Sequence, residues 1–323
     1  MKVAVFIALG RAHLDPPPSY DEKLKTSFPA IDFVIVKDVH ELLPALADAD
    51  VFFAPFVTEQ LLAAAPNLKW YHSSGIQFGQ YATDEIFRAP IMMTNARGAF
   101  ASLVAERVIG ATLFLTHRMT AAKELATVER KMGAMALMST QRLKGKTMGI
   151  VGLGHNGRAV AVLAHALGMR VVATKREVAA STPHGVEELW PSAELPKLLG
   201  QSHVLVITAP RTTETEGLIG AAQLAALPKD ALVINAGKPE IDDDQAVMDA
   251  LASGALYGYG CDDMVPDESP LRTQASPKVV LFPHAGPGDK TFWSGVYGIF
   301  AENLRRYIKG EELRNQVNRE LKY

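Results

Sequence analysis

The sequence lacks several features that mark particular classes of protein. Cys261 is its only cysteine, which excludes an internal disulfide and fits a reducing compartment. No apolar run approaches the roughly 18 residues of a membrane span. The net charge is −2, so there is no basic excess for nucleic acid or an anionic membrane. We therefore expect a cytoplasmic protein whose partners are neither nucleic acid nor membrane.

The first residues, MKVAVFIALG, place a charge before a short apolar run, as a signal peptide does. The run is short and no small-residue cleavage site follows it. The start of the chain is therefore interpreted as a buried first strand.

What the chain does contain is a regular alternation of short apolar runs with helical patterns. Its 323 residues, 48% of them hydrophobic, suffice for two domains of ordinary size. Strands alternating with helices predict parallel sheets that are covered on both faces. The first expected series of strands spans 2–9, 32–38, 51–56, 68–74 and 91–96, and the second spans 147–153, 170–175, 203–209, 231–236, 256–261 and 279–284.

Two helical stretches lie outside this alternation. Residues 99–119 are apolar nearly all round, which indicates a helix buried between domains or in a subunit interface. Residues 292–310 form an amphipathic pattern after the last strand, so this tail could pack back on the first domain.

A glycine pattern follows the first strand of the second series. Gly152, Gly154 and Gly157 have G-x-G-x-x-G spacing, with His155 and Asn156 between them. The pattern lies between an apolar strand and a helix, and another strand follows about 20 residues later, which is typical of a dinucleotide site. The first glycine allows a tight turn, the second lets the backbone approach a pyrophosphate, and the third lets helix and strand pack closely. N–H groups at the helix start then face the anion.

The second strand of this series ends in cations. An acid usually stands there to bind the ribose 2′-hydroxyl of NAD(H), but this chain has Lys175 and Arg176. Because two cations attract a 2′-phosphate, we predict a preference for NADP(H). If both are solvated surface cations instead, the choice stays open and NAD(H) is possible.

Several segments resemble, in the same order, those of the D-isomer-specific 2-hydroxyacid dehydrogenases, which include glyoxylate/hydroxypyruvate reductases and D-3-phosphoglycerate dehydrogenase. The resemblance runs nearly end to end. LKWYHSSGIQ resembles the family's substrate-carboxylate loop, and LKGKTMGIVGLGHNG its cofactor entry. TAPRTTETEGLIGAAQLAAL resembles the segment under the adenosine, and ALVINAGK the strand that carries the catalytic cation. LYGYGCDD and SPKVVLFPHAG resemble the nicotinamide and catalytic-histidine segments.

The resemblance implies an α/β fold of two doubly wound parallel-sheet domains. A Rossmann NAD(P)-binding domain, residues 99–289, would be inserted in a flavodoxin-like substrate domain made of residues 1–98 and 290–323. It also implies a homodimer, with the chemistry in the cleft between domains.

The general acid is predicted to be His284. It follows a strand directly, and ligands of open α/β sheets bind beyond the carboxyl ends of strands. Imidazole can give a proton near neutral pH, although a structural strand-end histidine is the alternative. The resemblance places a carboxylate behind this histidine, at Asp267 or at its neighbour Glu268, unless both are solvated loop acids.

The catalytic cation departs from the family's pattern. The family has Arg followed by Gly where this chain has Lys238 and Pro239. Lys is a point charge without a planar fork, so lower activity, a different substrate or an engineered position are all open. Asp242, Asp243 and Asp244 are expected to begin the next helix, where carboxylates suit the helix dipole.

The remaining predicted contacts involve backbone and cofactor. The amides of Ser74, Gly75 and Ile76 would bind the substrate carboxylate as an anion nest, unless they form a plain turn. The resemblance implies that Asp262 accepts a hydrogen bond from the carboxamide of the nicotinamide. Further cofactor contacts are predicted at Ala209, Pro210, Thr215, Ala236, Gly237 and Gly286, and no metal site is predicted.

The sequence thus predicts a reductase that converts a small 2-keto acid, such as glyoxylate or hydroxypyruvate, to the D-2-hydroxy acid with NADPH. A protein that binds partners in response to nucleotide, like the C-terminal-binding-protein corepressors, is an alternative that shares the fold. An oxidoreductase of the same fold that acts on another acid, such as phosphite, is a further alternative.

Overall fold

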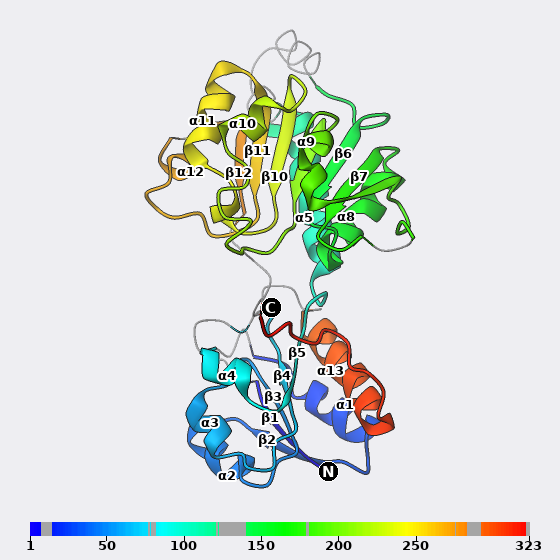
Figure 1. Cartoon of the computed structure of the whole chain (residues 1–323), viewed down its shortest axis with the longest axis vertical. Coiled ribbons are helices and arrows are strands. Elements are labelled where there is room, and N and C mark those ends of the chain that lie inside the picture. The colour runs from blue at the N-terminus through cyan, green and yellow to red at the C-terminus, as the bar shows by residue number, and fades with distance from the viewer. Residues whose placement is uncertain are drawn as a thin grey trace. The chain divides into compact units, whose positions relative to one another are not determined.

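The fold comes from a computed structural model, which describes residues 1–7, 15–76, 78, 82–120, 122, 140–178, 181–274, 276–282 and 292–320. The chain divides into two compact units (Figure 1). Unit 1 consists of Met1–Phe100 and Gly286–Tyr323, and unit 2 of Ala101–Ala285. The boundaries predicted from the sequence were 98/99 and 289/290, and the second of these lies outside the described residues.

Unit 1 is built on a parallel sheet of five strands in the order β2-β1-β3-β4-β5. Each strand lies within one of the five segments expected from the sequence. The strands are β1 (Lys2–Phe6), β2 (Asp32–Val36), β3 (Val51–Ala54), β4 (Trp70–Ser73) and β5 (Met92–Asn95). The helices of the unit are α1 (Ser19–Ser27), α2 (Leu42–Leu46), α3 (Glu59–Ala63), α4 (Asp84–Arg88) and α13 (Phe292–Lys309), with a 3-10 turn η1 (Val39–Glu41).

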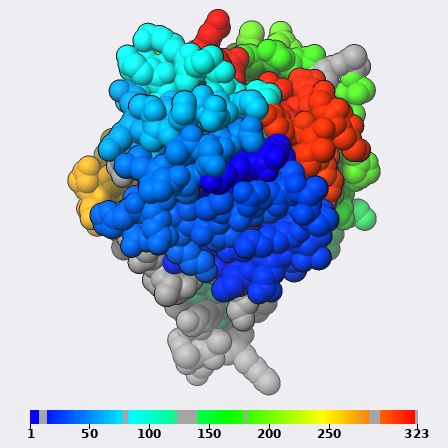
Figure 2. Space-filling view, turned by 90° about the horizontal axis from the view of Figure 1, so that it is seen from below, coloured from blue at the N-terminus to red at the C-terminus, as the bar shows by residue number. Residues whose placement is uncertain are grey.

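Neighbouring residues of each strand in this sheet face opposite layers. In β3, Phe52 packs in the cluster with α2, α3 and α4, whereas Phe53 packs in the cluster with α1 and α13. The C-terminal α13 therefore completes a core that the N-terminal segment begins. Tyr297 of α13 donates a hydrogen bond to Asp21 of α1 at 2.9 Å, and Figure 2 shows the red C-terminal segment against the blue N-terminal one.

Unit 2 contains a parallel sheet of seven strands in the order β12-β11-β10-β9-β6-β7-β8. Six strands were expected, and the additional one is the edge strand β8, which pairs with β7. Its sequence ELWP combines an acid and a proline in four residues, so it carried no apolar signal. The strands are β6 (Thr147–Val151), β7 (Arg170–Lys175), β8 (Glu188–Pro191), β9 (Val204–Ile207), β10 (Ala231–Asn235), β11 (Leu256–Cys261) and β12 (Val279–Leu281).

Helices cover both faces of this sheet (Figure 1), and a membrane-spanning helix is not found among those described. α5 and α8 pack in one hydrophobic cluster, and α9 to α11 in the other. The helices are α5 (Ala101–Thr116), α8 (His155–Ala166), α9 (Leu195–Leu199), α10 (Ala221–Ala225), α11 (Asp244–Ser253) and α12 (Pro270–Thr273), with 3-10 turns η3 (Ser192–Glu194) and η4 (Pro239–Ile241). Both sheets are therefore doubly wound, which confirms the predicted fold class.

The strand order of unit 2 reverses between β6 and β9. From β6 the chain runs outward through β7 and β8, then returns to β9 on the other side of β6. In such sheets the loops after the strands on either side of this point diverge and leave room for a ligand. The strand order therefore selects the carboxyl ends of β6, β9 and their neighbours as the candidate site.

Candidate active site

The predicted cofactor residues gather at one edge of the unit 2 sheet. All the strands are parallel, so the loops that follow them emerge at the same edge. The glycine pattern follows β6, Lys175 ends β7, Ala209 follows β9 and Asp262 follows β11. Residues distant in sequence are thus brought to neighbouring strand ends.

The three glycines of the phosphate loop differ in what surrounds them. Gly152 has φ +93°, and a Cβ there would lie 2.6 Å from the backbone of Ala209. A Cβ on Gly157 would lie 2.7 Å from the Gly152 carbonyl oxygen. Gly154, the residue preceding α8, has open space in the direction of its absent Cβ. Two glycines are therefore required by packing, whereas the middle one leaves its backbone accessible to a ligand.

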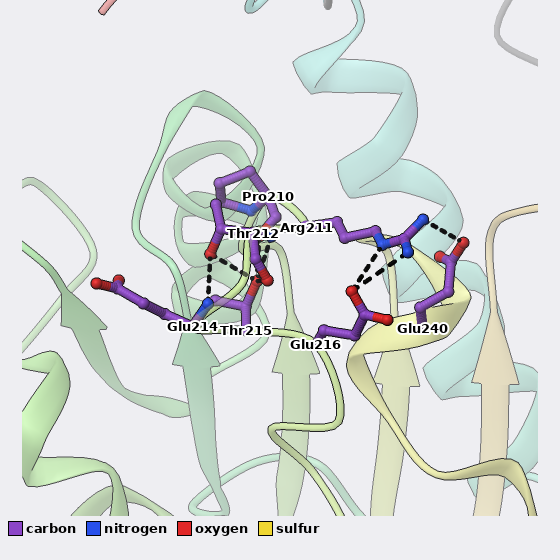
Figure 3. Close-up of polar contacts among 7 residues, drawn as sticks. All are labelled: Pro210, Arg211, Thr212, Glu214, Thr215, Glu216 and Glu240. Atoms are coloured by element: carbon purple, nitrogen blue, oxygen red, sulfur yellow. Dashed lines mark hydrogen bonds and ion pairs between the residues drawn. The ribbon is translucent and has the colours of Figure 1, made fainter. Parts of the chain in front are cut away.

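The loop after β9 is a turn held by its own side chains (Figure 3). The Thr215 hydroxyl donates to the Pro210 carbonyl at 2.7 Å, and the Thr212 N–H donates to the Thr215 hydroxyl at 2.8 Å. Arg211 forms ion pairs with Glu216 and Glu240. These contacts fix the turn that follows Ala209, whose backbone packs on Gly152 of the phosphate loop.

The turn that carries Lys238 is organised by a fully buried asparagine at the end of β10. The Asn235 amide donates to the Lys238 carbonyl at 2.9 Å and accepts from the Gly237 N–H at 2.8 Å. The absence of a side chain at Gly237 lets it approach Ala209, whose carbonyl oxygen would lie 2.8 Å from an added Cβ. The Ala236 N–H donates to the Ile207 carbonyl of β9. The Lys238 turn and the β9 loop are therefore packed directly together.

Lys238 is not an isolated cation. Its ammonium forms a 2.8 Å ion pair with Asp263, whose side chain is only 9% exposed. The other Asp263 oxygen accepts the Met264 N–H at 2.7 Å, which fixes the carboxylate. Lys238 is thus held at its backbone by Asn235 and at its ammonium by Asp263. The otherwise flexible lysine side chain is therefore anchored at both ends.

The neighbouring acid, Asp262, also has a cationic partner. Its carboxylate accepts a hydrogen bond from Arg107 of α5 at 2.8 Å, and its side chain is 7% exposed. The Asp262 N–H donates to the Asn235 carbonyl, which ties the β11 end to the β10 end. The predicted nicotinamide acceptor is therefore held in place by a residue that the sequence did not point to.

The position predicted for Asp242 from the sequence is wrong. Asp242, Asp243 and Asp244 were expected at the start of a helix, and two of them are there: Asp243 caps α11, accepting the N–H groups of Gln245 and Ala246, and Asp244 is its first residue. Asp242 is buried instead, between Asn235 and Tyr259, which donate to its two oxygens at 2.9 and 2.8 Å. Burial raises the pKa of Asp242 to about 7. The Asp242 carboxyl group accepts a hydrogen bond from the Asn235 amide, which also binds the Lys238 carbonyl. Asp242 therefore helps to position the Lys238 turn.

The predicted anion nest of unit 1 has fewer available amides than expected. The Ser74 N–H donates to the Ala54 carbonyl at 3.0 Å, and the Gly75 N–H to the Ser73 hydroxyl at 3.2 Å. Ile76 differs, because its N–H has no acceptor within the described part of the chain. Of the three amides, Ile76 is therefore the best placed to bind a carboxylate.

The predicted acid–base group is only partly described. His284 and the cofactor contact Gly286 lie outside the described residues. Asp267 is exposed and forms an ion pair with Arg272, and Glu268 is exposed too. His72 of β4 is unsuited to give a proton, since burial lowers its pKa to about 3 and keeps the ring neutral. It serves the core of unit 1 instead, in contact with Phe53 and Phe300.

Sequence reasoning missed Asn235, Asp263, Arg107 and Glu214, each of which holds a predicted site residue. One signal was present in the sequence, because two adjacent acids directly after a buried strand are costly unless both are paired. The identity of their partners depends on strand order, which a single motif does not reveal.

The chain resembles known proteins over nearly its whole length. A family model described as "D-isomer specific 2-hydroxyacid dehydrogenase, NAD binding domain" matches residues 109–286. A glyoxylate/hydroxypyruvate reductase B of Pectobacterium carotovorum is 30% identical over 283 residues, covering 85% of this chain and 87% of that protein. A glyoxylate reductase of Thermococcus litoralis is 28% identical over 295 residues, covering 88% and 86%.

A solved structure has the same fold. A D-isomer specific 2-hydroxyacid dehydrogenase from Xanthobacter autotrophicus, in complex with NADPH and MES, aligns over 99% of both chains with a TM-score of 0.77 and 22% identity. The fold and the phosphate loop define a nicotinamide-dinucleotide-dependent dehydrogenase. The chain belongs to the D-isomer-specific 2-hydroxyacid dehydrogenase family, and the predicted family and enzyme class are confirmed.

The phosphate loop gives a first prediction, which separates packing from ligand binding. Gly152→Ala should lower the free energy of unfolding by about 2 kcal/mol or more, because the new methyl group meets backbone at a positive φ. Gly154→Ala should leave the melting temperature nearly unchanged but weaken binding of the nicotinamide dinucleotide, measured by fluorescence titration. Equal loss of stability in both variants would contradict the assignment.

Asp242 gives a second prediction. The folded state keeps its proton up to about pH 7, whereas the unfolded state releases it near the ordinary value of 3.8. The stability that Asp242 contributes is therefore complete at low pH and is lost as the pH rises. Asp242→Asn, which mimics the protonated form, should raise the melting temperature at pH 8 relative to the parent protein and by much less at pH 4.

A matched control is Asp242→Ala, which leaves Asn235 and Tyr259 without their partner. This variant should melt at a lower temperature at both pH values. A gain for Asp242→Asn that is the same at pH 4 and pH 8 would show that titration of Asp242 is not the cause.

Proposed function

We propose that the chain reduces a small 2-keto acid, such as glyoxylate or hydroxypyruvate, to the D-2-hydroxy acid, with NADPH as the hydride donor. One observation carries the proposal. Gly237, next to Lys238, approaches Ala209, and Ala209 packs on Gly152 of the phosphate loop. A cation for the substrate and a loop for the cofactor are thus joined through two direct contacts. The names of the relatives from Pectobacterium and Thermococcus support the substrate class.

The preference for NADP(H) is supported by the end of β7. Lys175 is the last residue of this strand and Arg176 follows it, beside the phosphate loop on the adjacent β6. This is where the adenosine ribose lies in dinucleotide-binding sheets, so both cations would attract a 2′-phosphate. NAD(H) is proposed as a second cofactor. It lacks the 2′-phosphate, so it loses only the attraction of Lys175 and Arg176 and keeps the other contacts of the site.

Lys238 is the proposed cation for the substrate. An ammonium has three N–H donors, and the ion pair with Asp263 uses one of them. The remaining two can bind the substrate carboxylate and polarise the keto group. The Ile76 N–H, and more weakly those of Ser74 and Gly75, would contribute further donors to the carboxylate from unit 1.

His284 is the proposed general acid. When bound, NADPH supplies the hydride for the keto carbon. The imidazolium of His284 would give its proton to the alkoxide oxygen that forms, and Asp267 or Glu268 would stabilise the imidazolium and orient the ring. In this proposal residues 1–98 and 290–323 supply the substrate contacts, and residues 99–289 the cofactor contacts.

We also expect a homodimer. One side of α5 packs on the sheet of unit 2, while a groove of about 380 Å³ lies on another side. The groove is lined by Leu103, Glu106, Arg107, Gly110 and Phe114 of α5 and by Val280 and Phe282 at β12. A mostly apolar groove on a helix is a site where another chain can pack, so this face supports the expectation of a second copy there.

The experiment follows the absorbance of NADPH with glyoxylate, hydroxypyruvate, pyruvate and phenylpyruvate. At least one acid should be reduced, and His284→Asn should lower kcat by about 10² to 10⁴. The dissociation constant for NADPH should change little in this variant, because the proposed role of His284 is proton transfer. Absence of turnover with all four acids would count against the proposed function.

A second candidate is a partner-binding protein that responds to nucleotide. One observation favours it, namely that the positive charge of Lys238 is already balanced by the buried Asp263. Tight binding of NADPH without turnover in the same assay, together with a protein partner in a pull-down, would support this candidate.

A further inference from the structure

Arg176, one of the two cations assigned to the 2′-phosphate, has an acidic neighbour. Its guanidinium lies 3.2 Å from a carboxylate oxygen of Glu214, in the loop after β9. We propose that Glu214 is a second determinant of cofactor choice. Its carboxylate repels the 2′-phosphate of NADP(H) but accepts a hydrogen bond from the 2′-hydroxyl of NAD(H). This inference rests on the proposed function, because it assumes that the ribose of the cofactor lies beside Arg176.

The position of Glu214 is set by the turn that carries it. The Glu214 N–H donates to the Thr212 hydroxyl at 3.3 Å, and Thr212 is itself bonded to Thr215. Figure 3 shows Glu214 on one side of this turn, with Glu216 and Glu240 grouped around Arg211 on the other. Two glutamates of the same short loop thus face different arginines, and only Glu214 contacts a predicted cofactor residue.

The charges explain why Glu214 would act on cofactor choice in both directions. Arg176 and Glu214 have side chains that are 40% and 73% exposed, so their ion pair is weak and a phosphate can displace the carboxylate. The displaced carboxylate stays attached to a fixed turn and repels the doubly charged phosphate. A ribose hydroxyl, by contrast, can donate a hydrogen bond to the Glu214 carboxylate while the ion pair between Glu214 and Arg176 stays intact.

A site with both groups is expected to bind both cofactors. Lys175 and Arg176 supply the attraction for NADP(H), while Glu214 plays the part of the acid that sites for NAD(H) usually carry after their second strand. The acid comes here from the loop after β9, which explains why the residues after β7 alone did not reveal it.

The test compares Glu214→Gln with the matched control Glu216→Gln. Both variants remove one exposed carboxylate from the same loop, but Glu216 pairs with Arg211. Dissociation constants for NADP⁺ and NAD⁺ are measured by calorimetry, so no substrate is needed. Glu214→Gln should shift the ratio of affinities toward NADP⁺ by about tenfold at low salt, and the shift should shrink as salt is added. Glu216→Gln should leave the ratio within about twofold of the parent protein.

The outcomes separate this inference from the proposed function. An unchanged ratio in Glu214→Gln, or an equal shift in both variants, would overturn the role of Glu214. The double variant Lys175→Gln/Arg176→Gln provides the reference, and it should abolish the advantage of NADP⁺. If that advantage is absent from the parent protein, or survives the double variant, the NADP(H) assignment itself fails. If the double variant behaves as expected while Glu214→Gln has no effect, only the inference on Glu214 fails.

Discussion

The close approach of backbone to backbone at Gly152 and Gly157 is the constraint on which the site of unit 2 depends. A Cβ at either position would meet backbone atoms at less than 3 Å, so β6, α8 and the loop after β9 can meet only because both side chains are absent. This contact lies where the strand order reverses, and it brings the start of α8 next to Ala209. The Lys238 turn then packs on Ala209 through a third glycine, Gly237.

Around this contact, charged groups are held mainly by residues from neighbouring strand ends. Asn235 holds the backbone of Lys238, and Asp263 of the β11 end holds its ammonium. Arg107 holds Asp262 in the same way. Asp262 and Asp263 are therefore each balanced by a cation, and neither is left as an unpaired buried charge. These pairs hold the ammonium of Lys238 and the carboxylate of Asp262 in fixed positions at the strand ends.

Much of this arrangement could be predicted from the sequence, because it is local. The strands expected for unit 1, the glycine pattern and the helix after it depend on short-range periodicity and spacing. β8 was missed because ELWP has no apolar run. The pairs of Arg176 with Glu214 and of Lys238 with Asp263 join segments 38 and 25 residues apart, so they depend on which strands are neighbours. The acceptors of the Ser74 and Gly75 amides, Ala54 and Ser73, could not be predicted either, because no sequence motif marks them.

The central claim is that this chain transfers hydride from a reduced nicotinamide to the keto carbon of a small acid. The most direct measurement uses NADPH that carries deuterium at the transferable position of C4, with glyoxylate and hydroxypyruvate as acceptors. The account predicts that the 2-hydroxy acid formed carries deuterium at C2 and, from hydroxypyruvate, has the D configuration. A product without deuterium at C2, or with the L configuration, would contradict it.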